Sequence, residues 1–298
     1  MRVALTGSSG MTGLHMKSLL DVRGIACVDI GRSLWNLKEY KTPEQLDAIM
    51  GDVNAVFHFG AFVPSPLSNV VDDQNQTGNL FDVNVRSCLA LAEWATLRKI
   101  PLVFLSGATV YKDPYKPQIK ENDEKVVYGL GGLYGYSKLL AENVLEHYRS
   151  QGLNLITIRP SSIYGSFMPQ SRLVANFLQI ARENKVISLA EPVTNKINLV
   201  HSADVALASL TALQKSAWGI FNVPGPKSVT IQNIAEQCVS LTGKGSIKIV
   251  KNKNYVEPFD RFDLCYQHAS LTFGYQPQID LYDGISTMIE NRLFTLNK

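Results

Sequence analysis

The sequence predicts an α/β fold in which helices cover both faces of a doubly wound parallel sheet. Apolar runs of strand length occupy residues 2–5, 25–28, 55–59, 102–105 and 155–158. Segments of helical periodicity follow or separate them, at residues 14–20, 43–50, 85–98 and 136–148. Strands that alternate with helices in this way need crossover connections, and such connections build a parallel sheet.

The first strand leads directly into a glycine-rich turn, Thr6-Gly7-Ser8-Ser9-Gly10-Met11-Thr12-Gly13. A strand, such a turn and a helix in this order place backbone N–H groups at a helix N-terminus, where a pyrophosphate binds well. We expect Gly7 to make the tight turn, Gly10 to let the backbone approach the phosphates, and Gly13 to let helix and strand pack closely. The sequence therefore predicts a Rossmann-type dinucleotide site that also includes Ser9 and Met11.

Two charged residues bear on the choice of dinucleotide. Asp29 follows the second apolar run, about twenty residues after the turn, where a carboxylate binds the hydroxyls of the adenosine ribose. A carboxylate there accepts a hydrogen bond from a free 2′-hydroxyl and repels a 2′-phosphate, so we expect NAD. Arg32 follows shortly after and could receive that phosphate, which leaves NADP as the alternative.

Composition and charge argue against several other classes of protein. Apolar residues make up 45% and charged residues 18% of the 298 residues, and the formal net charge is only +3, with no basic run for nucleic acid. No apolar stretch is long enough to span a bilayer, and the N-terminus lacks a signal-peptide pattern. The four cysteines have neither metal nor disulfide spacing. We therefore expect a cytoplasmic protein without a metal, a membrane anchor or a nucleic-acid partner.

Beyond Pro160 the strands become shorter and the loops more frequent, with helical patterns at residues 203–213 and 231–241. We interpret residues 1–160 as the dinucleotide-binding domain and residues 161–298 as a smaller C-terminal α/β lobe that binds the substrate. Later segments such as 197–223 are expected to return to the first domain. Ligands of open α/β sheets bind outside the carboxyl ends of the strands, so the lobe should lie over that edge.

Tyr134 and Lys138 stand four residues apart at the start of a predicted helix, so both side chains project from one face. A tyrosine with an ordinary pKa of about 10 is a poor base at neutral pH. A nearby ammonium and an oxidised nicotinamide would favour the phenolate and lower that pKa. Tyr134 could then exchange a proton with a substrate hydroxyl as hydride leaves or reaches the same carbon, while Lys138 hydrogen-bonds the nicotinamide ribose.

Further motifs accompany the glycine turn and the Tyr134/Lys138 helix in a fixed order. They lie at residues 56–61, 84–85, 105–111, 158–165, 199–206, 221–223 and 273–277. Over nearly its whole length the chain resembles an extended short-chain dehydrogenase/reductase of the NAD-dependent epimerase/dehydratase family, which acts on nucleotide sugars. The resemblance implies an enzyme with Tyr134 and Lys138 as its catalytic pair.

The resemblance also implies further contacts to the cofactor. Asn36-Leu37 would lie near the adenine, in preference to Asp52-Val53, because a helical pattern follows the former. The phosphates and ribose would be lined by the residues at the end of the third apolar run and just after it, which are Phe59, Gly60 and Ala61. The nicotinamide carboxamide would meet the residues after the fifth run, which are Pro160, Ser161, Ser162 and Ile163.

For the substrate, the resemblance implies a diphosphate site. Arg261 stands where the family grips the diphosphate with an arginine, whose planar guanidinium matches phosphate oxygens in a bidentate fork. A second arginine, expected four residues before His201, is replaced by Ile197, with Lys196 beside it as a substitute. Ser161-Ser162 replaces an asparagine that is often found there, and we count Ser161 as a substrate contact.

One catalytic hydroxyl of the family is missing, because Gly107 occupies the position of its serine or threonine. Ser106 is adjacent but should point to the other face of the strand. Thr109 lies two residues on and could face the pocket, so we expect Thr109 to supply the hydrogen bond, with Ser106 as the alternative. Dehydratases of the family usually have an aspartate-glutamate pair where this chain has Ala108-Thr109, which makes dehydration the least expected reaction.

The leading hypothesis is NAD-dependent redox chemistry on a nucleotide-activated sugar, by an epimerase or a 4-keto reductase. The alternatives are a non-catalytic NAD(P)-binding regulator, which the missing serine allows, and a reductase of a non-sugar carbonyl compound. The Tyr134/Lys138 pair favours an enzyme, because a sensor needs only the glycine turn. Helices 85–98 and 136–148 carry apolar residues on more than one face, and in the family they form a four-helix bundle, so we expect a homodimer.

Overall fold

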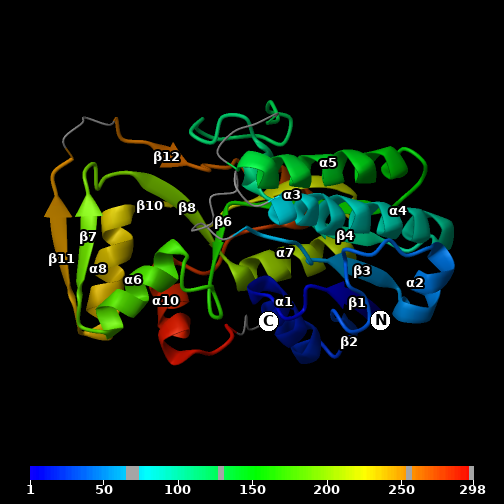
Figure 1. Ribbon diagram of the computed structural model, residues 1–298, viewed down its shortest axis with the longest axis horizontal. Helices are drawn as coiled ribbons and strands as arrows, with labels where there is room; N and C mark the ends of the chain where they lie inside the picture. Colours follow the sequence, from blue (N-terminus) through cyan, green and yellow to red (C-terminus); the bar gives the residue numbers. More distant parts are fainter. Residues whose placement is uncertain (65–73, 127–130, 253–256, 295–298) are drawn as a thin grey trace.

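The computed structural model describes residues 1–64, 74–126, 131–252 and 257–294 (Figure 1). Its centre is a six-stranded sheet with the order β2-β1-β3-β4-β5-β9, in which every neighbouring pair is parallel. The strands are β1 (Arg2–Thr6), β2 (Ala26–Ile30), β3 (Ala55–His58), β4 (Leu102–Leu105), β5 (Leu155–Pro160) and β9 (Gly219–Val223). The prediction of a Rossmann-type parallel sheet is confirmed.

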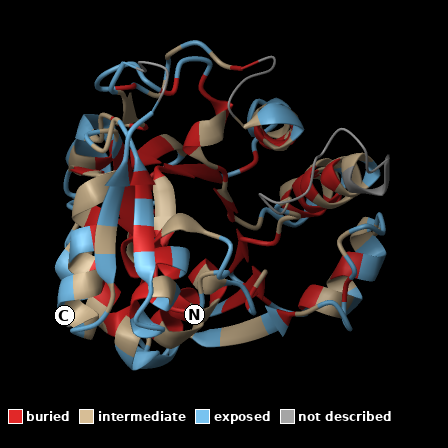
Figure 2. Ribbon diagram, turned by 60° about the vertical axis from the view of Figure 1, so that its left-hand side comes forward, coloured by how far each residue is buried: buried red, intermediate tan, exposed pale blue. Residues whose placement is uncertain are grey.

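Helices cover both faces of this sheet (Figure 1). One face carries α1 (Met11–Val22) and α7 (Ser202–Gln214), and the other carries α2 (Pro43–Met50), α4 (Ser87–Arg98) and α5 (Gly132–Arg149). Strand alternation separates the two cores, since Val3 and Leu5 pack with α1 and α7 whereas Ala4 packs with α2, α4 and α5. Figure 2 shows the buried residues concentrated in the strands and on the inner sides of the helices.

Three predicted helices begin earlier than expected, among them the one predicted from residue 136, which is α5 and starts at Gly132. The helix predicted from residue 14 starts at Met11 with Gly10 as its N-cap, so the glycine turn runs directly into it. The helix predicted from residue 85 is the end of a longer one, in which α3 (Gln74–Phe81), the π-helical turn η1 (Asp82–Arg86) and α4 follow without a break. A π-helical turn contains more residues per turn than an α-helix, so a search for 3.6-residue periodicity does not detect it. Such turns occur frequently at functional sites, and this one contains Asn84.

The C-terminal lobe has a core of its own, built from its helices and strands. The helices are α6 (Leu173–Arg182), α8 (Ile231–Thr242) and α10 (Leu281–Glu290). Strand β8 (Lys196–His201) pairs with β6 (Ser162–Tyr164), β10 (Ser228–Thr230) and β12 (Asp260–Arg261), while β7 (Val186–Ala190) pairs with β11 (Ser246–Val250). The last helix before α10, α9 (Gln267–Phe273), packs against the main sheet at β9.

The strand order fixes where a ligand fits. β1 lies between β2 and β3, so the connections that leave β1 and β3 run in opposite directions and open a crevice at the carboxyl ends of these two strands. The glycine turn follows β1, and Phe59 and Gly60 follow β3. The candidate site is therefore at this edge, with the turn η2 (Ala108–Val110) and the start of α5 beside it.

Candidate active site

The glycine turn forms a cradle that only glycine fits. Gly7 has a φ of +71°, and a Cβ on it would lie 2.5 Å from the backbone nitrogen of Gly60. A Cβ on Gly13 would lie 2.1 Å from the carbonyl oxygen of Gly7, and the Gly10 N–H closes the turn by donating to that oxygen over 3.0 Å. The turn after β1 and the loop after β3 are thus in direct contact at the N-terminus of α1. A dinucleotide pyrophosphate fits this arrangement.

The carboxylate of Asp29 lies beside this cradle. Lys17 Nζ donates a hydrogen bond to Asp29 Oδ2 over 2.7 Å, and the hydroxyl of Ser8 donates to the other oxygen. The bonds from Lys17 and then from Ser8 lower the pKa of Asp29, so the group is charged at neutral pH. The side chain of Asp29 remains 44% exposed and can still accept hydrogen bonds from a ribose. Arg32 is exposed just beyond the end of β2.

The fold places the two alternative pairs for the adenine site, Asn36-Leu37 and Asp52-Val53, at different edges of the sheet. Leu37 Cδ1 lies 2.5 Å from where a Cβ on Gly60 would stand, so Leu37 covers the loop after β3. Asn36 is exposed beside it. Asp52 and Val53 instead precede β3 at the opposite edge of the sheet, and Val53 is buried in the core. This placement favours Asn36-Leu37 over Asp52-Val53.

Tyr134 and Lys138 lie in the first two turns of α5. Tyr134 is half-buried, whereas only 2% of Lys138 is exposed. The ammonium of Lys138 lies 4.2 Å from the ring centre of Phe104. Burial lowers the pKa of Lys138 to about 8. Burial raises the pKa of Tyr134, and the charge that opposes this rise belongs to Arg172, whereas the charge of Lys138 does not act on Tyr134 in the chain without a bound cofactor. The physical reason is that α5 places the ammonium against the aromatic ring on β4.

The π-helical turn holds the start of α5 in place. The hydroxyl of Ser137 donates to the carbonyl oxygen of Tyr134 over 2.8 Å and accepts from Asn84 Nδ2 over 3.0 Å. The same Asn84 side chain accepts from the N–H of Phe62 over 2.7 Å and donates to its carbonyl oxygen over 3.0 Å. Asn84 therefore ties the loop after β3 to the turn that carries Tyr134. Sequence reasoning assigned it no role, although a buried polar residue within a helical stripe was the available signal.

Thr109 packs directly against that turn. A Cβ on Gly131 would lie 2.8 Å from Thr109 Cβ, and one on Gly135 would lie 2.5 Å from the carbonyl oxygen of Thr109. Among the described residues, the buried hydroxyls of Thr109 and Ser106 have no hydrogen-bond partner. A buried hydroxyl without a partner is costly, so a ligand hydroxyl suits this place. Its contact with the two glycines that flank Tyr134 favours Thr109 over Ser106.

The chain after β5 adds another unpartnered hydroxyl at the same edge of the sheet. Pro160 is the last residue of β5, and Ser161 beyond it is buried, with no partner for its hydroxyl in the described part of the chain. Ser162 and Ile163 begin β6, are half-buried, and pair with β8 of the lobe. These residues lie where the main sheet passes into the lobe.

The register of β12 against β8 corrects one substrate prediction. Arg261 pairs with Ile197, and Asp260 pairs with Lys196. Paired residues of parallel strands point to the same face and successive residues to opposite faces, so Lys196 points away from the side that Arg261 and Ile197 share. Lys196 is therefore badly placed to replace the missing arginine. Arg261 lies 5.1 Å from the ring centre of Phe259, and its buried Nε has no partner among the described residues.

A buried ionic network, which sequence reasoning missed, fixes α5 to the sheet. Arg159 at the end of β5 makes two hydrogen bonds to the carboxylate of Glu142 on α5, over 3.0 and 2.5 Å, and both side chains are at most 3% exposed. Its Nη1 donates to the hydroxyl of Tyr111 over 3.0 Å, and that hydroxyl donates to Asn222 Oδ1 on β9 over 2.6 Å. The network connects α5 to the carboxyl ends of β5 and β9.

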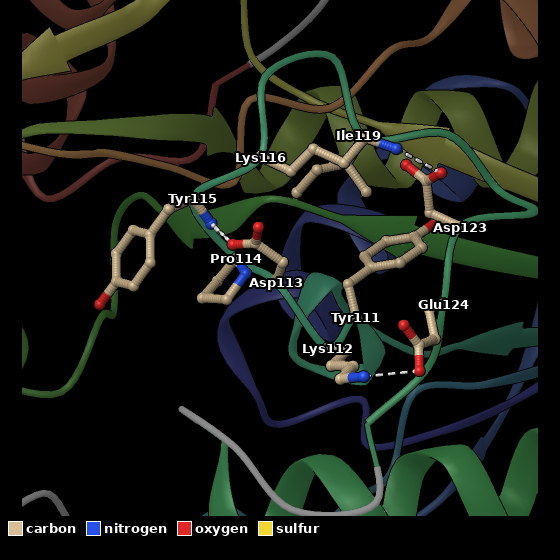
Figure 3. A pocket seen from close by; sticks show the side chains of 9 residues that line it. All are labelled: Tyr111, Lys112, Asp113, Pro114, Tyr115, Lys116, Ile119, Asp123 and Glu124. Atoms are coloured by element: carbon tan, nitrogen blue, oxygen red, sulfur yellow. Dashed lines mark hydrogen bonds and ion pairs between the residues drawn. The ribbon is translucent and has the colours of Figure 1, made fainter.

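Residues of the loop from Tyr111 to Glu124 line an open cavity of about 780 Å³ (Figure 3). Four of its five charged side chains are paired with one another, Lys112 with Glu124 over 2.7 Å and Lys116 with Asp123 over 2.6 Å, and the fifth, Asp113, accepts a hydrogen bond from the N–H of Tyr115 over 2.9 Å. We therefore assign the cavity no part in catalysis.

Within the described residues, no group of three or more His, Cys, Asp or Glu side chains is placed to hold a metal ion. None of the described helices combines the length and apolar character that crossing a membrane requires.

Comparison with known proteins agrees with this geometry. The pattern of the NAD dependent epimerase/dehydratase family matches residues 3–223. The chain is 23% identical to bovine dTDP-D-glucose 4,6-dehydratase over 318 aligned positions, which cover 97% of this chain and 88% of the relative. The chain belongs to the NAD dependent epimerase/dehydratase family, a family of enzymes in the extended short-chain dehydrogenase/reductase superfamily.

Solved structures show the same fold. UDP-N-acetylglucosamine 4-epimerase from Bacillus cereus superposes with a TM-score of 0.82 at 18% identity, covering 100% of this chain and 99% of the other. MoeE5 in complex with UDP-glucose and NAD gives a TM-score of 0.79 at 19% identity, with 98% of each chain covered. The prediction of fold class and family is confirmed.

Proposed function

We propose that the chain catalyses NAD-dependent redox chemistry at a hydroxyl-bearing carbon of a nucleotide sugar, as an epimerase or a 4-keto reductase. One observation carries the proposal: the turn of α5 that bears Tyr134 packs on Thr109, whose buried hydroxyl has no partner among the described residues. Both residues follow strands or turns at the same sheet edge as the glycine cradle. A proton-exchanging phenol and a second hydrogen-bonding hydroxyl beside a dinucleotide are what oxidation of an alcohol requires.

The residues present fit NAD. The pyrophosphate would lie over the cradle of Gly7, Gly10 and Gly13, and the adenosine ribose would meet the charged carboxylate of Asp29. The family to which the chain belongs is named for NAD. When bound, NAD would accept and return the hydride. Side chains of the protein would carry out the proton transfers.

Three side chains would act on the sugar. Tyr134 would take the proton from the reacting hydroxyl, or return it in the opposite direction, as a general base and acid. Thr109 would donate or accept a hydrogen bond at the same oxygen and so fix its orientation. Arg261 would hold the diphosphate in a bidentate fork, at the end of the site remote from Tyr134. Lys138 would contact the nicotinamide ribose.

The proposal of a nucleotide sugar as substrate is supported by the relatives and by the lobe. One relative of the chain is a dTDP-D-glucose 4,6-dehydratase. MoeE5, which has a similar fold, has been solved in complex with UDP-glucose and with UDP-glucuronic acid. Ala108-Thr109 provides no acidic pair, so dehydration remains the least expected reaction. Membership of an enzyme family disfavours the regulatory alternative.

Product analysis tests this function and separates its two forms. The chain is incubated with a panel of UDP- and dTDP-sugars and NAD, and with the 4-keto forms and NADH, and the sugars are identified by NMR. An epimer formed without net consumption of cofactor establishes an epimerase, and NADH consumed in proportion to product establishes a reductase. Conversion of a simple ketone but of no nucleotide sugar would contradict the proposal.

Replacing Asp29 by alanine is expected to weaken the binding of NAD more than that of NADP. The change removes hydrogen bonds to the ribose of NAD and at the same time removes the repulsion of a 2′-phosphate. Calorimetric titration of both cofactors against the wild type and the variant measures this. Asp52→Ala is the matched control, because Asp52 is exposed at the opposite edge of the sheet. Equal losses for the two cofactors would show that Asp29 is not a ribose contact.

Replacing Thr109 by valine is expected to slow turnover by roughly tenfold or more, because a hydrogen bond to a developing charge contributes about 1.5–3 kcal/mol. Valine keeps the shape that packs against Gly131 and Gly135. The steady-state rate and the melting temperature are measured together, with Ser106→Ala as the comparison. A neutral Thr109→Val and a damaging Ser106→Ala would assign the role to Ser106 instead.

The missing hydroxyl can also be restored. Gly107 has extended backbone, with a φ of −179°, and a Cβ on it would have Thr109 Oγ1 at 3.7 Å as its nearest neighbour. A serine therefore fits without strain, and we expect Gly107→Ser to hold or raise the rate.

We also propose a homodimer through the outer faces of α4 and α5. Several apolar residues of these helices are buried in the chain's own core, among them Leu91, Trp94 and Leu145. Leu97 is 62% exposed, and Leu140 and Val144 are only half-buried, which leaves apolar surface for a second copy. Light scattering at micromolar concentration is expected to give twice the monomer mass, and the monomer mass would contradict the proposal.

A further inference from the structure

A buried histidine that the proposed reaction does not use lies between the glycine cradle and the π-helical turn η1. His58 is the last residue of β3, and only 1% of it is exposed. Its Nδ1 lies 2.7 Å from the hydroxyl oxygen of Thr6, the last residue of β1. Its Nε2 lies 3.2 Å from the hydroxyl oxygen of Ser87, the first residue of α4. Both ring nitrogens therefore have a hydrogen-bond partner inside the protein.

The neighbouring groups decide which nitrogen of His58 carries the proton. A carbonyl oxygen can only accept, so the hydroxyl of Ser87 donates its proton to the carbonyl oxygen of Val83, 2.5 Å away. Ser87 has no second proton, and Nε2 of His58 must therefore donate to Ser87. On the other side, the N–H of Gly60 donates to the hydroxyl oxygen of Thr6 over 3.1 Å, and Thr6 in turn donates to Nδ1.

The surroundings keep the imidazole neutral, as this pattern requires. The ring of His58 stacks on Phe104 with centres 5.9 Å apart, and the ammonium of Lys138 lies 4.2 Å from the centre of that same ring. Burial and then the charge of Lys138 lower the pKa of His58 to about 3. A neutral imidazole donates at one nitrogen and accepts at the other. The chain of hydrogen bonds from Gly60 to Val83 thus runs in a single direction.

This chain ends on the turn that contains Asn84. A π-helical turn pairs each carbonyl oxygen with an N–H five residues on, instead of the four of an α-helix. Side chains that follow the turn bind two of its carbonyl oxygens. The hydroxyl of Ser87 binds that of Val83, and the thiol of Cys88 donates to that of Asn84 over 3.2 Å. Side-chain hydrogen bonds therefore support the turn at the two residues where Asn84 is presented.

Asn84 is the link between this turn and Tyr134. Its side chain binds both the N–H and the carbonyl oxygen of Phe62, in the loop after β3, and donates to the hydroxyl of Ser137. That hydroxyl donates to the carbonyl oxygen of Tyr134. Residues 58–62, which include those proposed to line the cofactor, are thus bound at both ends to η1 and the residue that follows it.

We propose that His58 is a positioning residue for Tyr134: protonated at Nε2 alone, it joins the ends of β1 and β3 to the π-helical turn whose Asn84 fixes the first turn of α5. The proposal rests on Tyr134 being the proton carrier of the proposed function. The chain of hydrogen bonds begins at Thr6 and Gly60, which border the glycine cradle. One set of hydrogen bonds therefore holds the cofactor side and the acid–base side of the site in a fixed relation.

The protonation of His58 can be measured in the wild type, without substrate or cofactor. The chain is labelled with ¹⁵N-histidine and long-range ¹H–¹⁵N spectra are recorded, in which protonated and unprotonated ring nitrogens have well separated ¹⁵N shifts. Loss of one set of signals in His58→Gln assigns His58 among the five histidines. We expect a neutral ring protonated at Nε2 at neutral pH. A ring protonated at Nδ1, or at both nitrogens, would overturn the proposal.

Hydrogen exchange at the N–H of Phe62 shows whether Asn84 stays in place, because this N–H donates to its side chain. In Ser87→Ala, the exchange of this N–H should accelerate by about tenfold, as expected when one hydrogen bond is lost, while the amides of β4 keep their rates. Thr96→Val is the matched control. The hydroxyl of Thr96 also donates to a carbonyl oxygen four residues earlier on α4, over 2.7 Å, but away from the π-helical turn.

Variants of His58 extend the test to the active enzyme. A glutamine amide can take the place of Nε2 and donate to Ser87, whereas an asparagine amide can take the place of Nδ1 only. We therefore expect His58→Gln to keep kcat within a few-fold. His58→Asn and Ser87→Ala should lower kcat by at least about tenfold with little change in KM, because a displaced acid–base group slows the chemical step.

Unchanged exchange at Phe62 in Ser87→Ala, or an equal acceleration in Thr96→Val, would overturn the proposal. A uniform acceleration that includes the amides of β4 would also overturn it, and would make Ser87 a residue of general stability. If nucleotide sugars are converted and Ser87→Ala keeps its kcat, the proposed function stands and the positioning role falls. Accelerated exchange at Phe62 alone, in a protein that converts no nucleotide sugar, would leave the link from His58 to Asn84 in place and refute the proposed function separately.

Discussion

Replacing Tyr134 by phenylalanine is expected to slow turnover by at least about a hundredfold, while the chain still folds and binds NAD. General acid–base catalysis by a positioned side chain typically contributes about 10²- to 10⁴-fold. The substitution removes only the hydroxyl, and the contacts that hold this turn use other atoms: Ser137 binds the carbonyl oxygen of Tyr134, and Gly131 and Gly135 pack on Thr109. The loss should therefore fall on the chemical step.

Steady-state turnover and calorimetric binding of NAD measure this prediction. Tyr136→Phe is the matched control, because Tyr136 is also half-buried on the same part of α5 and loses the same hydroxyl. The control is expected to keep its rate within a few-fold. If Tyr134→Phe did the same, Tyr134 would not be the proton carrier.

Replacing Arg159 by methionine is expected to destabilise the chain by about 3–5 kcal/mol, because it leaves the buried carboxylate of Glu142 without its partner. Arg159 also donates to Tyr111 and to the carbonyl oxygen of Glu121, so several acceptors lose their donor together. Since Glu142 lies one turn after Lys138, the start of α5 should lose its fixed position at the same time.

Urea unfolding followed by circular dichroism measures the free energy of unfolding. The double variant Glu142→Leu/Arg159→Met should recover part of the loss, because it leaves no unpaired buried charge. Arg98→Met, which removes an ion pair whose side chains are about 40% exposed, should cost much less than Arg159→Met. A loss from Arg159→Met as small as that of Arg98→Met would show that the buried network does not stabilise the fold.

The sheet and the dinucleotide turn could be predicted from the sequence because their causes are local. Alternation of apolar runs with helical periodicity determines a parallel sheet, and Gly7 and Gly13 occupy positions where any side chain would collide with backbone. Thr109 could be selected over Ser106 by strand alternation, and the structure places it against the turn of Tyr134. The choice of Asn36-Leu37 over Asp52-Val53 likewise followed from the helix that comes after it.

The remaining parts of the site depend on contacts between distant segments. Asn84 acts through a π-helical turn that changes the helical period, and Arg172 reaches Pro64 from 108 residues away. Lys196 seemed a suitable substitute until the pairing of β12 with β8 placed it on the other face. The contact of the Lys138 ammonium with the ring of Phe104 joins segments more than thirty residues apart. None of these relations has a signature in local sequence.

The most direct test of the central proposal is to mix the wild-type chain, saturated with NAD, with each member of a panel of UDP- and dTDP-sugars and follow the absorbance of reduced nicotinamide in a single turnover. We predict that at least one nucleotide sugar produces reduced nicotinamide in the wild type, and that Tyr134→Phe suppresses this signal at least about a hundredfold. A chain that binds NAD but produces no reduced nicotinamide and no altered sugar with any nucleotide sugar would contradict the account.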